Sequence, residues 1–293
     1  MNIYKEQESN VWKTWFLMSL FLVIIIGIGW TFSYIYGNPI ILVVAVVFSL
    51  VMNVISYWYS DSIVLSLYSA KPVTREDYTD LWNITENISI SAGLPMPKLY
   101  VIAESQPNAF ATGRDPKHSA VAVTSGLLEI LNRSELEGVI AHEMAHIGNR
   151  DTLLQTVIVV LVGFVALLSD FFMRSQLLGA GKRDSDSKAG GVIVLVGIVL
   201  AIIAPIAVTL IQLAISRKRE FLADATGALF TRYPEGLAMA LQKISADTKP
   251  MRMANHATAH LFISNPFGAK KSLMNLFATH PPVVDRINKL MGK

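Results

Sequence analysis

The chain has 293 residues, of which 52% are hydrophobic and 16% are charged, whereas soluble domains have about 25% charged residues. This composition excludes an ordinary soluble protein and indicates a membrane protein that contacts the lipid bilayer. The net charge of +3 is spread among lysines and arginines that flank apolar segments, so we expect no nucleic-acid partner. Because the chain has no cysteine, any metal must be held by histidine and carboxylate side chains.

Four apolar segments have about the 20 residues that a membrane-spanning helix needs. Segments 15–34 and 40–59 predict a hairpin within residues 1–59, and the first has no small-x-small cleavage site, so we expect the hairpin to be retained. Segments 153–172 and 192–215 predict a second hairpin within residues 152–216. The third segment could instead be a buried core helix, since it ends near a charged residue, Asp170.

The distribution of basic residues predicts which side of the membrane the soluble parts occupy. The loop at 35–39 has no Lys or Arg, whereas the opposite ends of the spans are flanked by basic residues, which places the soluble blocks 60–151 and 217–293 in the cytoplasm. The basic residues within 173–191 disagree with this orientation. With an even number of crossings between them, the two blocks can form one catalytic unit on one side of the membrane.

The first soluble block predicts a small α+β unit. Thr74 opens a helix that runs to about residue 91 and ends at Gly93. Short strands at 98–103 and 119–124 bracket the segment 107–113, and a helix follows near 125–131.

The next helix carries the most informative motif, His142-Glu143-Met144-Ala145-His146. Ser134 with Glu137 forms a capping-box pattern at the start of this helix, and Gly148 offers a break at its end. On a helix His142 and His146 share one face and can bind one metal ion, with Glu143 as general base. By chance the H-E-x-x-H pattern would occur about 0.005 times in such a chain. The alternative is two surface histidines beside a solvated glutamate.

A catalytic zinc site usually has three protein ligands and one water. Glu220 and Asp224 follow the fourth apolar segment and share one helical face, so Glu220 can bind zinc and Asp224 can orient a ligating histidine. An ordinary acidic face beside the basic residues 217–219 explains the same pattern equally well.

The chain resembles the HtpX family of bacterial membrane zinc metalloproteases, which are related to the CAAX prenyl proteases. Three separate pieces carry the resemblance: the motif at 142–146, the segment 216–224, and Thr279-His280-Pro281-Pro282 followed by Arg286. The segments 108–113 and 260–267 also resemble the family, and the order of the apolar segments fits along nearly the whole chain.

The resemblance implies an α+β membrane protein with four transmembrane helices and a mostly helical zincin-type catalytic domain that contains a small β-sheet. It implies a zinc endopeptidase of the bacterial cell membrane whose substrates are polypeptides, in particular damaged or misassembled membrane proteins. One Zn²⁺ per chain is then bound by His142, His146 and Glu220, while Glu143 activates water. Asp224 does not bind the zinc itself but orients one of the zinc-binding histidines.

The resemblance implies four further roles. His280 and Arg286 would donate to the oxyanion of the tetrahedral intermediate, although a helix-capping histidine and an exposed arginine are an alternative. Asn108 and Ala109 would hold the substrate backbone by strand addition, although Asn before a turn is common for conformational reasons.

Other interpretations remain open at this point. A CAAX-type prenyl-peptide protease shares the zinc chemistry, but four spans are few for its large chamber. A catalytically silent adaptor or chaperone is disfavoured by the intact Glu143, and a transporter by the scarcity of charges within the spans. His256 and His260 have the spacing of a second metal pair, but no glutamate accompanies them, so we expect a structural role.

Overall fold

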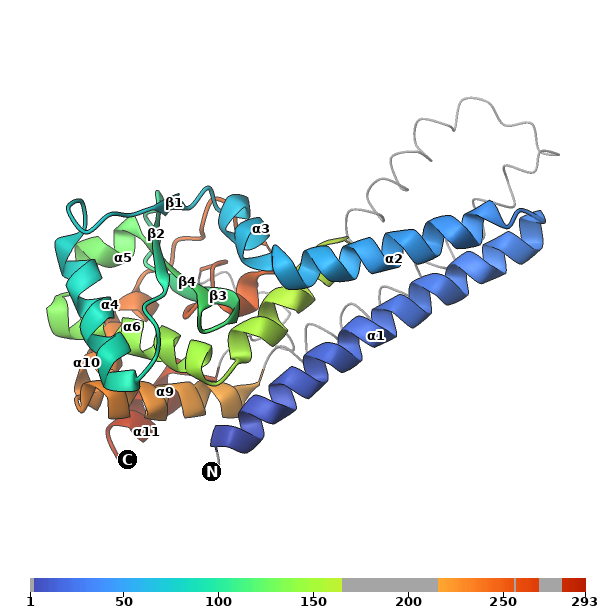
Figure 1. Cartoon of the computed structure of the whole chain (residues 1–293). Helices are drawn as coiled ribbons and strands as arrows, with labels where there is room; N and C mark the ends of the chain where they lie inside the picture. Colours follow the sequence, from blue (N-terminus) through green and yellow to red (C-terminus); the bar gives the residue numbers. More distant parts are fainter. Residues whose placement is uncertain (1–2, 165–215, 256, 269–280) are drawn as a thin grey trace.

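The structure is a computed structural model that describes residues 3–164, 216–255, 257–268 and 281–293. A long hairpin of helices α1 and α2 projects from a compact body that holds the described strands and most of the other described helices (Figure 1). In chain order the labelled elements are α1 (Ile3–Tyr36), α2 (Ile40–Trp58), α3 (Ser60–Leu67), β1 (Lys71–Pro72), α4 (Thr79–Ala92), β2 (Lys98–Ile102), β3 (Ala109–Asp115), β4 (His118–Thr124), α5 (Ser125–Ile130), α6 (Arg133–Gly148), α9 (Arg217–Thr231), α10 (Pro234–Ala246), the 3-10 helix η1 (Ala259–Leu261) and α11 (Val283–Leu290).

The hairpin helices α1 and α2 cover the first two predicted spans, and both are long and apolar enough to cross a bilayer. Large apolar side chains on them, such as Val23, Trp30 and Val47, are more than half exposed, which suits a surface covered by lipid. The two helices approach closely at Gly29, where a Cβ atom would overlap the side chain of Ala45. Small residues permit such close packing of membrane helices.

A further helix, Asp151–Phe164, follows α6 after a bend of 81° and covers the beginning of the third predicted span. The remainder of that span, the fourth span and the segment 173–191 lie outside the described residues. In the part of the chain that the structure describes, two helices are therefore candidate spans, or three if the bent pair counts as one.

The sheet has four strands in the order β1-β2-β4-β3. Strand β2 runs parallel to β4, whereas β1 and β3 pair antiparallel with their neighbours. Both faces of the sheet are covered, because Ala109 and Ala111 belong to one apolar cluster and Phe110 to another. Strand β3 lies at the edge nearest the motif helix, and the sheet therefore presents a strand edge to the candidate site.

The central helix of the body is α6. Apolar side chains around its circumference pack against α4 and α10, and residues 139–147 are all buried. A helix with apolar contacts on every side occupies the interior of a fold. Its buried residues include the motif histidines and glutamate, so these polar groups need partners inside the body.

Two local predictions were wrong in detail. The cap of helix α6 lies two residues before the predicted one, because Asn132 accepts from the Glu135 backbone and Glu135 bonds back to the Asn132 backbone. Helix α4 begins at Thr79, because Thr74 closes a separate turn with Asp77. The segment 107–113, which lies between two predicted strands, contains most of a further strand, β3. The left-handed C-cap at Gly93 and the helix near 125–131 are confirmed.

Candidate metal centre

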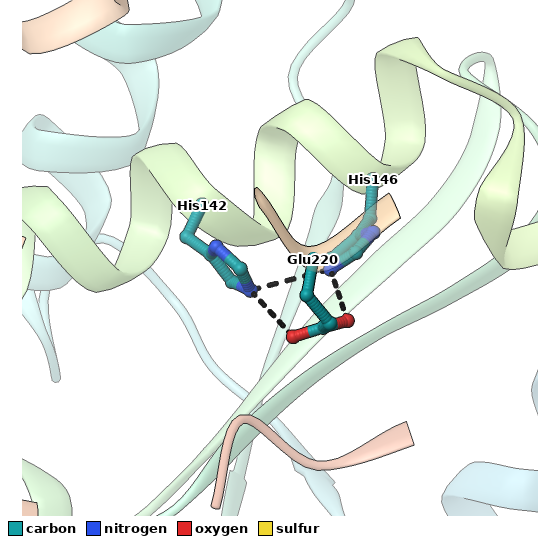
Figure 2. Close-up of side chains that lie close together, drawn as sticks. All are labelled: His142, His146 and Glu220. Carbon is teal, nitrogen blue, oxygen red and sulfur yellow. Dashed lines mark hydrogen bonds and ion pairs between the residues drawn. The ribbon is translucent and has the colours of Figure 1, made fainter. Parts of the chain in front are cut away.

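Two helices bring the candidate ligands together. His142 and His146 lie one turn apart on α6, and Glu220 comes from the first turn of α9 (Figure 2). The helices can approach closely here because α9 has a glycine at the crossing: a Cβ atom on Gly227 would lie 3.0 Å from the backbone nitrogen of His142. A larger residue would push Glu220 away from the histidines.

The ligand atoms of the three side chains converge on one point. The Nε2 atoms of His142 and His146 are 3.2 Å apart, and the carboxylate oxygens of Glu220 lie 3.9 Å from the first and 3.4 Å from the second. All three side chains are buried, and the cluster could hold a metal ion. Two imidazoles and one carboxylate are a donor set that catalytic zinc sites use.

Each histidine is held from behind by a carboxylate. His146 Nδ1 lies 2.9 Å from Asp151 Oδ2, and His142 Nδ1 lies 3.0 Å from Asp224 Oδ1. A carboxylate at Nδ1 fixes the tautomer that carries its proton there, which leaves the Nε2 lone pair free. Both lone pairs then point into the cluster, where a proton or a metal ion relieves their repulsion. The residues therefore fit a metal ion.

Burial and the neighbouring charges shift the pKa values of the two histidines in opposite directions. Burial lowers the pKa of His142 to about 4, although Asp224 opposes this effect. Burial also disfavours the charged form of His146, but Asp151 and Glu220 outweigh it and raise the pKa of His146 well above its usual range. Two carboxylates that stabilise a proton on His146 would equally stabilise a metal cation at its Nε2 atom.

Glu143 lies on α6, where this helix packs against strand β3 and the backbone of Ala111 is near its carboxylate. Its side chain is buried, and burial raises the pKa of Glu143 to about 7, with Glu220 contributing in the same direction. A carboxylate with a pKa near neutrality is suited to accept and return a proton.

Arg286 of α11 connects the carboxylates of this centre. Its Nε and Nη2 atoms donate to the two oxygens of Asp224 at 2.9 and 2.6 Å, and its Nη1 lies 3.6 Å from Glu220 Oε2. Arg286 is 1% exposed. Burial alone would raise the pKa of Asp224, but Arg286 and His142 outweigh it and lower this pKa to about 2. Asp224 is therefore ionised at neutral pH.

Asp151 is the supporting residue that the sequence analysis did not assign. It follows the end of α6 by three residues, and the chain reaches it through Arg150, whose φ of 61° is left-handed. This turn brings Asp151 back to His146, which helix periodicity alone could not indicate. The pattern of an acidic residue five positions after the second motif histidine was the only available signal.

Two further predicted residues, Asn108 and Ala109, lie at the start of strand β3. Asn108 is buried, and its side-chain amide pairs with the backbone of Ser264: Nδ2 donates to the carbonyl at 3.0 Å, and the Ser264 N–H donates to Oδ1 at 3.1 Å. The Ala109 carbonyl accepts from the N–H of Ile263 at 3.0 Å. At this point of the β3 edge, backbone groups are thus occupied by the chain itself, and the substrate role of Asn108 and Ala109 stays a prediction.

Two predicted residues, His280 and His256, lie outside the described residues. His260 is buried in η1. The expectation that the 256/260 pair is structural therefore stays a prediction.

Residues 76–293 match the sequence profile described as Peptidase family M48. The chain belongs to this family. Relatives are similar over nearly their whole length: a "Protease HtpX homolog" of Caldanaerobacter subterraneus subsp. tengcongensis is 49% identical over 98% of this chain and 97% of its own. A "Protease HtpX homolog" of Pyrococcus furiosus is also 49% identical, over 95% of this chain and 94% of its own. The predicted HtpX resemblance is confirmed.

A solved structure shares the fold. The "Crystal Structure of S. mikatae Ste24p" aligns with a TM-score of 0.51 and 20% sequence identity, and covers 96% of this chain and 66% of that one. This M48 chain is accordingly a membrane metalloprotease, and its histidine and glutamate cluster fits the metal site of such an enzyme.

Proposed function

We propose that this protein is a membrane-embedded, zinc-dependent endopeptidase that cleaves polypeptides, in particular damaged or misassembled membrane proteins. The observation that carries the proposal is the buried cluster of His142, His146 and Glu220, with Glu143 beside it at the edge of the sheet. The two histidines and Glu220 would hold one zinc ion. A bound zinc ion supplies Lewis acidity, which acidifies water and polarises a scissile carbonyl.

The residues around the cluster suggest how the proton moves. Glu143 accepts a proton from the attacking water and passes it to the leaving amine, and burial, which raises its pKa, strengthens it as a base. No covalent acyl-enzyme is required by this arrangement.

Arg286 and Asp224 support the ligands. Because both oxygens of Asp224 accept from Arg286, the carboxylate is fixed and can orient His142 through Nδ1. These contacts favour an orienting role for Arg286, beside its proposed donation to the tetrahedral intermediate. The same donor role for His280 rests on its sequence position.

Substrate binding is expected along strand β3. An edge strand has unpaired backbone groups to which an extended peptide can add. Ala109 and Asn108 contact Ile263 and Ser264 in this structure, so their proposed role requires these two residues to leave the start of β3 when the substrate binds.

The location follows from the hairpin. The start of α1 and the end of α2 both lie at the body, and the turn at 37–39 is at the far tip (Figure 1). The body therefore lies on one side of the membrane if the hairpin is inserted. The basic residues that flank the spans favour the cytoplasmic side of the cell membrane.

The test compares two Glu→Gln variants of α6 in the full-length protein, purified in detergent with zinc. Glu143→Gln should lower hydrolysis of an unfolded polypeptide by at least about 10²-fold, the scale of general-base catalysis, while zinc stays bound. Glu137→Gln is the matched control, because Glu137 lies on the same helix and, among the described residues, forms an ion pair only with Arg133.

The outcomes separate the competing functions. Normal turnover of Glu143→Gln would contradict the mechanism. Zinc binding by the wild-type protein without any cleavage would indicate an adaptor or chaperone. Cleavage restricted to prenylated peptides would indicate a CAAX-type protease.

A further inference from the structure

A polar side chain from the membrane hairpin reaches the metal centre. Asn10 lies near the start of α1, the end of that helix that contacts the body (Figure 1). Its Nδ2 donates to Asp151 Oδ1 at 2.7 Å and to the backbone carbonyl of Asn149 at 3.1 Å. The other oxygen of Asp151 contacts Nδ1 of His146 at 2.9 Å. The chain of contacts thus runs from a membrane helix to a ligand in two steps.

The orientation of the Asn10 amide is determined by its surroundings. Both atoms that face Nδ2 are acceptors, a carbonyl and a carboxylate oxygen, so only the amino group can occupy this position. Asn10 is 0% exposed, and its Oδ1 has no hydrogen-bond partner among the described residues. Such burial is costly, and an apolar residue would fill the position at lower cost unless the two donated bonds matter.

The same end of α1 also binds the end of the motif helix. Gln7 Nε2 donates to the carbonyl of Gly148 at 2.6 Å, and Asn10 donates to the next carbonyl along. The last carbonyls of a helix have no partner within it. Helix α1 therefore caps α6 at the point where the chain turns towards Asp151.

Asp151 also has a cationic neighbour, Arg219, but it is more distant than Asn10. Arg219 Nε lies 3.7 Å from Asp151 Oδ1, which is 1.0 Å farther than the Asn10 donor. Asn10 therefore supplies the short hydrogen bond that fixes the direction of the carboxylate, whereas Arg219 supplies charge.

We propose that Asn10 is a positioning residue of the metal centre, which docks the membrane hairpin onto it by holding Asp151 against His146. The inference rests on the proposed function, since it assumes that His146 binds the metal. A loss of this contact allows Asp151 to rotate, and His146 then loses the partner that fixes its ring. Binding of the metal thereby depends on the position of α1 against the body.

The experiment measures zinc affinity by chelator competition in the full-length protein in detergent, together with the visible spectrum of the cobalt-substituted form. Asn10→Ala should weaken zinc binding by about 10-fold, the lower end of the range for groups that support a ligand, and should alter the cobalt bands. Asn10→Asp should weaken it more, because it replaces the donor by a second carboxylate against Asp151.

Thr14→Val is the matched control. Thr14 is 0% exposed one turn along α1, and its hydroxyl donates to the Asn10 carbonyl within the helix. The variant should retain wild-type zinc affinity and spectrum. Equal zinc affinities for Asn10→Ala and Thr14→Val would overturn the inference.

A double-variant cycle tests the route of the effect. In an Asp151→Asn background, Asn10→Ala should cause little further loss of affinity, because the acceptor that it holds has already changed. Losses that multiply would show that Asn10 acts elsewhere and would overturn the inference. If the wild-type protein binds zinc and cleaves polypeptide while Asn10→Ala has the same zinc affinity, the inference fails but the proposed function stands. If the wild-type protein itself does not bind zinc, the proposed function is contradicted.

Discussion

The ion pair between Asp224 and Arg286 gives a prediction with two separable parts. Asp224→Asn keeps the shape of the side chain but removes its charge, and this leaves the guanidinium of Arg286 buried without its principal partner. Asp224 is 3% exposed and Arg286 is 1% exposed, so water cannot replace the lost contact. The same change weakens the acceptor for Nδ1 of His142.

The magnitude of the stability loss follows from this burial. Removing one partner of a buried ion pair costs about 3–5 kcal/mol. Glu220 lies 3.6 Å from Arg286 Nη1 and compensates part of the charge, so we expect the lower end, about 3 kcal/mol. For a protein of this size the midpoint of thermal unfolding of the metal-free protein should then fall by about 6–12 °C.

The double variant Asp224→Asn with Arg286→Met separates charge from ligand support. The methionine removes the uncompensated charge and fills similar volume, so most of the thermal stability should return. Zinc affinity should stay about 10–100-fold below that of the wild type, because His142 still lacks its carboxylate. A double variant as unstable as Asp224→Asn alone would refute the argument from buried charge, and full recovery of zinc affinity would refute the argument from His142.

Three further predictions concern single residues. Glu220→Gln should lose zinc and activity in a zinc titration, and a stoichiometric, active zinc in this variant would mean that Glu220 is not the third ligand. Because the pKa of Glu143 is raised to about 7, this group stabilises the metal-free fold below the unfolded-state pKa of about 4.5 and loses that contribution as pH rises through about 7. The thermal midpoint of Glu143→Gln should therefore exceed that of the wild type by a margin that grows from pH 4.5 to 7 and then stays constant. A margin independent of pH would refute the argument from the raised pKa of Glu143. Gly227→Ala should weaken zinc binding, because the added methyl group lies 3.0 Å from the α6 backbone, whereas Gly27→Ala on α1, with nothing within 4 Å, should leave zinc affinity unchanged.

The parts of the site that lie in local sequence patterns could be predicted. The spacing of His142 and His146 determines that they share a face of α6, and the resemblance to the HtpX family identified Glu220, which the structure brings to within 3.9 Å of both histidines. Helix α5 and the cap at Gly93 also follow from residues next to one another in the chain.

Features that depend on distant contacts could not be predicted in the same way. Asn132 and Ser134 are both good N-cap residues, but Asn132 prevails because Glu135 bonds back to it and also contacts Lys243 of α10 at 2.7 Å. Strand β3 has small residues and a glycine that resemble a connection, and it is a strand because apolar clusters cover both of its faces.

The metal centre depends on helices from both parts of the molecule. One histidine is held by Asp224, which Arg286 of α11 fixes with two hydrogen bonds inside the body. The other, His146, is held by Asp151, whose short hydrogen bond comes from Asn10 of the membrane hairpin. The carboxylate that holds His142 is thus fixed from within the body, whereas the one that holds His146 is fixed by the membrane hairpin. A displacement of α1 loosens only the side of His146, so the geometry of the ligands should change before the metal is lost, and the membrane hairpin can influence the reaction without contacting the substrate.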